Sequence, residues 1–164
     1  MKKVKRRRKT ATQPVNKKVR NAAKIKYDGI QFQSRLEVYC YRKLKDAGIT
    51  FEYEPTYFEL MPKFEYEPSC MESYKKGAKW LFGDKSKVIR AMRYKPDFVN
   101  LKDGWIIECK GHPNESFPNK WKLFKYYLKQ NMIDVHLYMP KNQTHVDECV
   151  TEILKTVYGR ETIL

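Results

Sequence analysis

The pattern of apolar and polar residues predicts alternating helices and strands. Apolar side chains recur at helical spacing in residues 34–47, 116–130 and 144–158, which are expected to form helices. Runs rich in aromatic and β-branched residues predict strands at 49–54, 57–61, 88–100, 105–110 and 134–139, and a hairpin over 25–32 that turns at Asp28-Gly29. This order predicts an α/β fold. Residues 62–86, rich in Tyr and Lys, are expected to form a long loop or insertion.

Charge divides the chain into two parts. The 164 residues carry a formal net charge of +15, and residues 1–26 contain twelve Lys and Arg with no Asp or Glu. We therefore expect a disordered basic arm over 1–24, followed by one domain over 25–164. A polyanion such as nucleic acid is the expected partner of the arm, through Lys5, Arg6, Arg7 and Arg8. A solubilising tail or a targeting signal is the alternative.

Several classes of protein are disfavoured by what the sequence lacks. No apolar run is long enough to span a bilayer, and no apolar stretch follows the basic start, so neither a membrane span nor a secretory signal is expected. The four cysteines are widely scattered without a CxxC pair, which argues against structural zinc and suits reduced thiols inside a cell. No glycine-rich phosphate loop or serine nucleophile motif is present.

The candidate chemistry lies in the predicted strand pair around residues 97–110. Glu108 and Lys110 alternate with Cys109, so their side chains project from one face, and Asp97 lies on the preceding strand. If residues 101–104 form a four-residue loop, Asp97 pairs with Glu108. If the turn has two residues, Asp97 instead pairs with Lys110. Both registers place the three side chains on one face.

Two carboxylates opposed beside a buried strand require compensation. A divalent cation with oxygen ligands would provide it, and Mg²⁺ typically binds one or two carboxylates, waters and a phosphate. Such an ion readies water for attack on a phosphodiester, which Lys110 could assist. The alternative is an exposed hairpin in which Lys110 only forms an ion pair. Trp105, Ile106 and Ile107 argue against it, because a surface hairpin would alternate apolar and polar residues.

Glu37 is a third candidate carboxylate. The run Ser34-Arg-Leu-Glu37 is a capping-box signature, in which Ser34 caps the helix and Glu37 reaches back to the chain that precedes it. Glu37 can therefore be a cap, a member of the acidic site, or both.

Three motifs together resemble the PD-(D/E)xK nuclease superfamily. They are Phe32-x-Ser34-x-x-Glu37, Tyr94-x-Pro96-Asp97-Phe98 and Glu108-x-Lys110-Gly111. The resemblance covers about residues 24–140 in the order of elements. It is closest to small phage-type endonucleases similar to phage endonuclease I and to Holliday junction resolvases. It implies a restriction-endonuclease-like core, in which a central mixed sheet is flanked by helices and carries the active site at one edge.

The resemblance also implies roles for individual residues. Asp97, Glu108 and the main-chain carbonyl of Cys109 would bind Mg²⁺, for which Mn²⁺ would substitute. Lys110 would be the catalytic lysine, and Glu37 would hold a second metal ion or its water. The implied activity is hydrolysis of DNA phosphodiester bonds, with preference for branched or junction DNA. The implied setting is intracellular, in the host cytoplasm if the chain is phage-encoded, and the implied assembly is a homodimer.

Basic residues outside these motifs are candidates for contact with DNA. The predicted helix 116–130 carries a stripe with Lys122 and Lys125, and Lys120 lies one turn into it. Residues 75–93 interleave cations with aromatics, which suits either a grip on a nucleic-acid strand or an ordinary surface loop. Two other functions remain open: a non-catalytic nucleic-acid-binding protein, and a basic structural protein of a virion or ribosome.

Overall fold

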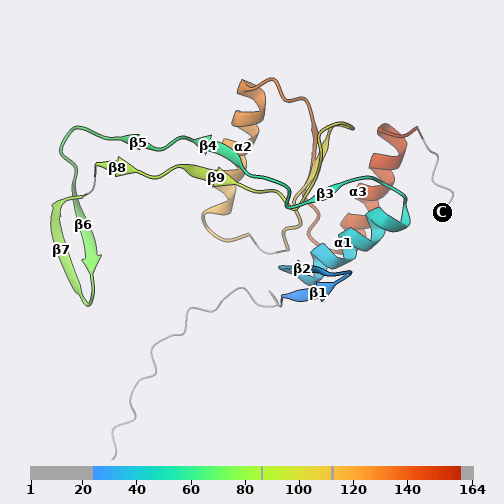
Figure 1. The fold of residues 1–164 in the computed structure, drawn as a ribbon, viewed down its shortest axis with the longest axis horizontal. Helices are drawn as coiled ribbons and strands as arrows, with labels where there is room; N and C mark the ends of the chain where they lie inside the picture. The colour runs from blue at the N-terminus through green and yellow to red at the C-terminus, as the bar shows by residue number, and fades with distance from the viewer. Residues whose placement is uncertain (1–23, 86, 112, 160–164) are drawn as a thin grey trace, which may run out of the picture.

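The computed structural model describes residues 24–85, 87–111 and 113–159, so the predicted basic arm lies outside it apart from Lys24. Helices span Arg35–Asp46 (α1), Phe117–Gln130 (α2) and Gln143–Thr156 (α3). Strands at the start of the chain are Ile25–Tyr27 (β1), Ile30–Phe32 (β2), Glu52–Tyr53 (β3), Phe58–Met61 (β4) and Phe64–Glu65 (β5). The others are Met71–Lys76 (β6), Lys79–Asp84 (β7), Val88–Ile89 (β8), Met92–Tyr94 (β9), Phe98–Asn100 (β10), Trp105–Ile107 (β11) and His136–Tyr138 (β12). The predicted mixed α/β class is confirmed: three helices accompany several small sheets (Figure 1).

Local sequence signals fix the first elements. Strands β1 and β2 form the predicted hairpin, and Asp28 and Gly29 both have positive φ, as a two-residue turn of this kind requires. The Ser34 side chain accepts a hydrogen bond from the Glu37 amide and so starts α1. Gly48, with φ of 67°, follows the end of α1. These signals act within a few residues, which is why the sequence predicts them well.

The largest sheet has four strands in the order β12-β11-β10-β3. Strands β10 and β11 are antiparallel with Phe98 opposite Ile107 and Asn100 opposite Trp105, which confirms the four-residue loop and excludes the two-residue turn. Strand β12 adds to β11 in parallel, so the sheet is mixed. The predicted strand 134–139 is shorter than expected. It is also only half-buried rather than buried, because it forms an edge of the sheet.

The hydrophobic core lies on both faces of this sheet. Trp105 and Ile107 pack with α1 and α3, whereas Ile106 packs with α2. Because successive side chains of a strand point to opposite faces, all three residues are completely buried only when both faces are covered. Figure 1 shows α2 on one side of the sheet and the pair α1 and α3 on the other.

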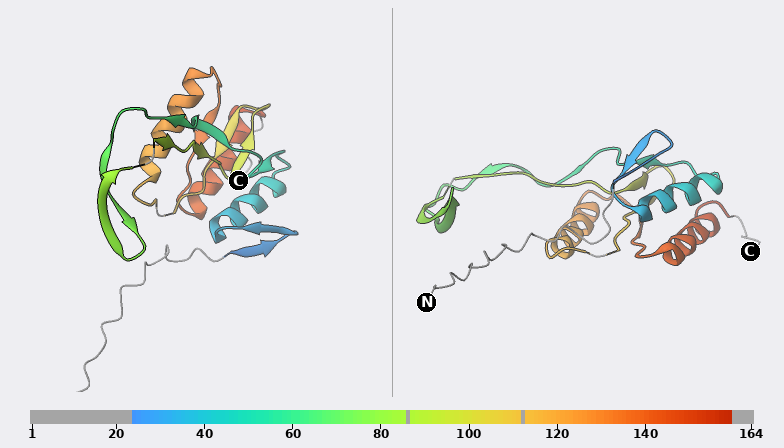
Figure 2. Two further views of the ribbon diagram at one scale, coloured as in Figure 1. Left: turned by 60° about the vertical axis from the view of Figure 1, so that its left-hand side comes forward. Right: turned by 90° about the horizontal axis from the view of Figure 1, so that it is seen from below.

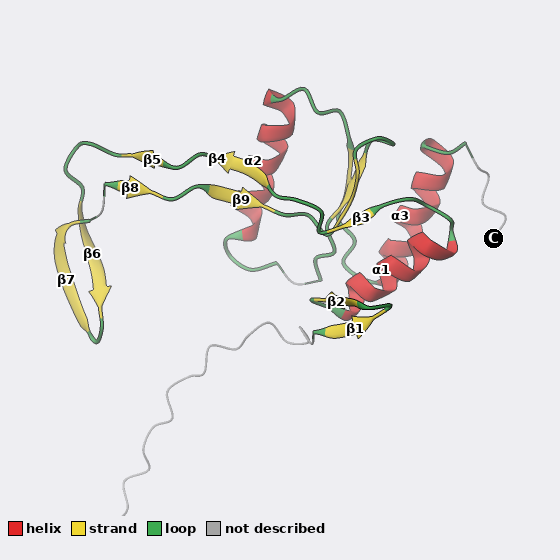
Figure 3. Cartoon of the chain, viewed as in Figure 1, coloured by secondary structure: helices red, strands yellow, loops and turns green. Residues whose placement is uncertain are grey.

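The predicted loop over 62–86 is wrong. Strands β4 and β9, then β5 and β8, pair in antiparallel fashion and lead outward to the hairpin of β6 and β7. We call residues 58–94 the ribbon. Figures 1 and 2 show the ribbon extending away from the helices, and Figure 3 shows its strands in succession. The loop prediction failed because the strands within residues 62–86 are almost entirely exposed, so the sequence carries no signal of a buried face there.

None of the helices within the described residues is long and apolar enough to cross a bilayer. All four cysteines are free thiols, as their spacing predicted.

Candidate active site

The site lies where β10 and β11 separate. The predicted strand 105–110 ends at Ile107, because β10 begins only at Phe98 and the preceding Pro96 has no amide hydrogen to donate to a sheet. Beyond this point the Asp97 side chain makes the contact between the two segments: its Oδ2 accepts a hydrogen bond of 2.7 Å from the Cys109 amide. On the other side, Lys110 still donates its amide to the Pro140 carbonyl at 3.0 Å. The chain beyond β11 is thus held from both sides.

Asp97 and Glu108 form an acidic pair in which Glu108 is buried and Asp97 is half-buried. The register of β10 and β11, extended by one residue, places them opposite each other, and Glu108 is only 5 % exposed. Burial raises the pKa of Asp97 well above its ordinary value, and the charges of Glu108 and Glu37 raise it further. Burial likewise raises the pKa of Glu108, although Lys110 opposes the increase. Both acids therefore resist ionisation unless positive charge is supplied.

One carboxylate oxygen of Glu108 faces the Lys110 amine, and the other faces no well-formed hydrogen-bond donor in the described residues. The Lys110 amine is 3.5 Å from Glu108 Oε1 and 4.7 Å from the centroid of the Phe117 ring at the start of α2. Glu108 Oε2 is buried without a hydrogen bond of acceptable geometry within the described residues, and so is the nearby Tyr94 hydroxyl. Burial, followed by the charge of Glu108, raises the pKa of Tyr94. A buried carboxylate oxygen without a partner is costly, so it marks a place that suits a ligand.

Glu37 is buried at the start of α1, and its carboxylate is occupied. Its Oε1 accepts a hydrogen bond from the Ser34 hydroxyl at 2.7 Å. Its Oε2 accepts from the Gln33 amide at 2.9 Å and the Tyr53 hydroxyl at 2.7 Å. The predicted capping role is confirmed, with the amide of Gln33 as the partner of the carboxylate. The same carboxylate is close enough to Asp97 and Glu108 to raise the pKa of both.

The structure thus brings Glu37, Asp97, Glu108 and Lys110 to one end of the sheet. In the part of the chain that it describes, no group of three or more His, Cys, Asp and Glu side chains is arranged to hold a metal ion. The ligand set implied for Mg²⁺ contains only two side chains, Asp97 and Glu108, because its third member is the main-chain carbonyl of Cys109. Pro96 stands opposite Cys109 in the extended register and has no amide hydrogen to donate to that carbonyl.

The predicted DNA-contacting residues fall into two groups. Lys122 and Lys125 are exposed on α2, and Lys120 is half-buried in its first turn. Their helix begins at Phe117, against the Lys110 amine, so it leads away from the site. Lys5, Arg6, Arg7 and Arg8 lie outside the described residues.

Two tyrosines at the site were not assigned roles from the sequence. Tyr53 binds Glu37 from β3, and Tyr94 lies against Glu108 from the end of the ribbon. Tyr94 belongs to one of the quoted motifs, which was its only signal. Tyr53 gave none, because its partner is sixteen positions away and the contact depends on the fold.

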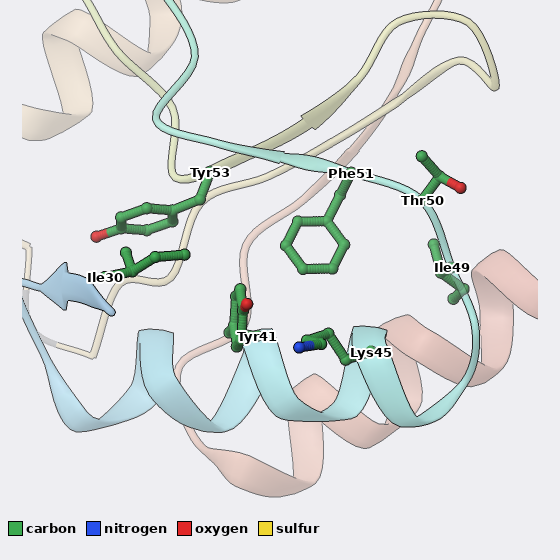
Figure 4. Close-up of a pocket in the computed structure, with 7 residues that line it drawn as sticks. All are labelled: Ile30, Tyr41, Lys45, Ile49, Thr50, Phe51 and Tyr53. Carbon is green, nitrogen blue, oxygen red and sulfur yellow. The ribbon is translucent and has the colours of Figure 1, made fainter. Parts of the chain in front are cut away.

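A pocket of about 340 Å³ lies next to this cluster, between α1 and residues 49–53. Figure 4 shows Tyr53 and Phe51 along one side and Tyr41 and Lys45 on α1 along the other. The Lys45 amine is already paired with Asp28 at 2.7 Å, so the pocket has no uncompensated charge at this position. Tyr53 lines the pocket and also binds Glu37, and thus joins the pocket wall to the acidic cluster.

The chain belongs to the family described as "Protein of unknown function (DUF1064)", whose model matches residues 17–144. That range contains all four clustered residues and the whole ribbon. No curated protein and no solved structure matches the chain.

Proposed function

We propose that this DUF1064-family protein is a Mg²⁺-dependent endonuclease that hydrolyses DNA phosphodiester bonds. The observation that carries the proposal is the acidic pair of Asp97 and Glu108, buried at the end of a strand pair beside the amine of Lys110. Within a hydrophobic core such a pair destabilises the fold, and a bound cation reverses that effect. The order of motifs along the chain agrees with the resemblance to PD-(D/E)xK nucleases.

The residues present fit a hard divalent cation. Glu108 Oε2 is buried beside the Tyr94 hydroxyl without a well-formed hydrogen bond in the described residues, and burial raises the pKa of both acids although Lys110 opposes the increase. Asp97, Glu108 and the Cys109 carbonyl would hold Mg²⁺, with waters and a phosphate oxygen completing its shell. When bound, the ion supplies a polarised phosphodiester and a water of lowered pKa.

The chain's own groups would then position the reaction. The Lys110 side chain is 30 % exposed and packs on Phe117, so its amine faces both Glu108 and solvent. It can orient the attacking water or neutralise charge that develops on the phosphate. Glu37, held by Tyr53, adds negative charge behind Asp97 and would position a second ion or its water.

The fold and the charge also suit this activity. The four-stranded mixed sheet with helices on both faces supports a restriction-endonuclease-like core. The exposed lysines of α2 would contact phosphates, and the basic first residues would add affinity for DNA by counterion release. We further propose an intracellular setting, host cytoplasm for a phage-encoded chain, and a homodimer that cuts branched or junction DNA.

Plasmid cleavage tests the proposal. The full chain should nick supercoiled DNA with Mg²⁺ or Mn²⁺ but not with EDTA, and a panel of linear, nicked, flapped and four-way-junction DNA should reveal the preferred shape. Asp97→Asn, Glu108→Gln and Lys110→Met should slow cleavage by about 10²–10³-fold or more. All three variants should still bind DNA, which shows that they are folded. The exposed control Glu115→Gln should cut like the parent. Equal cleavage by all variants would refute the assignment.

A non-catalytic nucleic-acid-binding protein is the second candidate. The ion pair of Lys110 with Glu108 and the fully occupied carboxylate of Glu37 favour it, since both are structural contacts. Under this alternative no metal-dependent nicking occurs, while DNA binding is retained.

A further inference from the structure

The hairpin of β6 and β7 exposes large aromatic side chains on one face. Trp80 is 71 % and Phe82 69 % exposed. They are two positions apart on β7, so both point to the same face, with Cα atoms about 6.7 Å apart. The register places Lys75 opposite Trp80 and Ser73 opposite Phe82 on that face. A water-exposed aromatic pair on a protruding hairpin is unusual and indicates a binding surface.

The opposite face of the same hairpin is different. There the Tyr74 ring covers Gly83, at 3.8 Å from the position of a Cβ atom, and the Lys85 amine lies 4.6 Å from the centroid of that ring. The aromatic residue on this face is therefore already packed within the ribbon. Trp80 and Phe82 take no part in the ring or cation contacts found in the described residues.

Charge identifies the kind of partner. Residues 73–82 contain three lysines: Lys75 lies on the aromatic face beside Trp80, and Lys76 and Lys79 lie on the opposite face next to the turn. The acid on the aromatic face is Asp84, opposite Met71 at the far end of the hairpin from the turn. Flat aromatic faces beside lysines suit a single nucleic-acid strand, whose bases stack while its phosphates meet the cations. A second copy of the chain fits less well, because two hairpins packed face to face would bring like-charged lysines together.

We propose that the face formed by Lys75, Trp80 and Phe82 binds unpaired nucleotides of DNA by base stacking. The inference rests on the proposed nuclease function for its biological meaning: it identifies the substrate as DNA with a single-stranded segment, such as a flap or an opened junction. The two aromatic side chains project side by side from one face, with Cα atoms about 6.7 Å apart, so each ring is open to one base. One base can therefore stack on each ring along a continuous strand.

The ribbon connects this face to the acidic site. Its last strand, β9, ends at Tyr94, which lies against Glu108, and the chain continues directly to Asp97. Figures 1 and 2 show the ribbon leading from the sheet outward to the β6–β7 hairpin. An unpaired strand bound along the ribbon would thus be directed towards the carboxylates.

Binding without cleavage tests the inference. A fluorescent twenty-nucleotide oligo(dT) and a twenty-base-pair duplex are titrated with the full chain in EDTA, and anisotropy gives the affinities. The double variant Trp80→Ala/Phe82→Ala should bind oligo(dT) about 30-fold more weakly, since each stack contributes about fivefold or more. Its duplex binding should change less than twofold. Leu81→Ala, on the same strand but the opposite face, is the matched control and should bind both DNAs like the parent.

A second readout separates stacking from a general effect. Tryptophan emission of the parent should be quenched by oligo(dT). In Trp80→Phe, which keeps an aromatic ring, the quenching should fall while affinity stays within about threefold of the parent. Unchanged oligo(dT) binding by the double variant, or an equal loss for duplex DNA, would overturn the inference. So would a parent dimer that becomes monomeric in the double variant with oligo(dT) binding intact.

The two proposals fail in different ways. Loss of oligo(dT) binding in the double variant, without metal-dependent cleavage of any DNA by the parent, would support the ribbon inference and refute the nuclease. Metal-dependent cleavage that requires Asp97, with oligo(dT) binding unaffected by the double variant, would do the reverse.

Discussion

The acidic site and the β6–β7 hairpin depart from ordinary protein packing in opposite directions. The site buries Asp97 and Glu108, which would be better solvated in water. The hairpin exposes Trp80 and Phe82, which would be more stable in a core. In each region the free chain carries an unfavourable arrangement that a partner of complementary chemistry would relieve. Under the two proposals, the site would bind a divalent cation and the hairpin would bind an unpaired nucleic-acid strand.

The two regions also differ in what holds them. The site is fixed by a sheet with a core on both faces, whereas the hairpin is held by its own ladder of backbone hydrogen bonds and a few local contacts, such as Tyr74 against Gly83 and Lys85. Substitutions in and around the acidic site should therefore change the free energy of unfolding. Substitutions on the exposed face of the hairpin should instead change the affinity for nucleic acid. The following predictions test that difference, from the largest effect to the smallest.

Removing an aromatic side chain should show the largest difference in stability between the two regions. Phe124→Ala removes a completely buried ring from beneath the sheet and should lower the free energy of unfolding by about 3–5 kcal/mol. Phe82→Ala removes an exposed ring and should change it by at most about 0.5 kcal/mol. Urea unfolding followed by circular dichroism measures both. Equal losses would mean that Phe82 is packed in a core, contrary to its exposure.

Neutralising one buried acid should stabilise the metal-free protein. Because the pKa of Asp97 is raised by burial, the native state loses stability as pH rises from the unfolded-state value of Asp, about 3.9, towards the native-state value. Asp97→Asn removes this loss and can still accept the Cys109 amide. In EDTA near pH 8 it should be more stable than the parent by about 1–2 kcal/mol.

That advantage should disappear below about pH 4, where the carboxyl group is protonated in both states. Thermal unfolding across pH measures it. Added Mg²⁺ should raise the melting temperature of the parent and leave that of Asp97→Asn nearly unchanged. Glu115→Gln, at an exposed acid, is the control and should follow the parent. A variant less stable than the parent in EDTA would contradict a strained acidic pair.

Glu37→Gln should have a smaller effect on stability than Phe124→Ala or Asp97→Asn. The amide can keep two of the three hydrogen bonds of Glu37 but cannot accept at both oxygens, so unfolding should become easier by about 0.5–1.5 kcal/mol. If the negative charge serves the site, cleavage should also slow by tenfold or more. Cleavage at the parental rate would leave Glu37 as a helix cap only.

The sequence predicts elements whose signals are local. The Asp28-Gly29 turn, the Ser34 cap and the loop over 101–104 each fix a neighbouring geometry. The outer strands of the ribbon, within residues 62–86, were missed because β6 and β7 pair without burying a face, so the sequence lacks the signal of a buried strand there. Strands at 57–61 and 88–100, where the ribbon joins the sheet, were predicted. The exposure of β12 was missed because a strand's place at a sheet edge depends on the strands that pair with it.

The same limit applies to the candidate site, where the sequence predicts what local geometry determines and misses the contacts between separate elements. The juxtaposition of Asp97, Glu108 and Lys110 follows from strand alternation and loop length, which the sequence contains. The contacts of Tyr53 and Tyr94 with carboxylates do not, because they join separate elements of the fold. The sequence also left open whether Glu37 caps a helix or faces the other acids, and in the structure it does both.

Asp97 performs a structural task that constrains how the site can change. Its carboxylate accepts a hydrogen bond from the Cys109 amide beyond the last backbone pair of β10 and β11, so it extends the pairing of the two chain segments by one contact. Removing this side chain would take one negative charge from the acidic pair and would also loosen the chain that follows β11. An asparagine at this position would keep an acceptor for the Cys109 amide without the charge, so under the proposed function it would give a folded protein that does not cleave DNA.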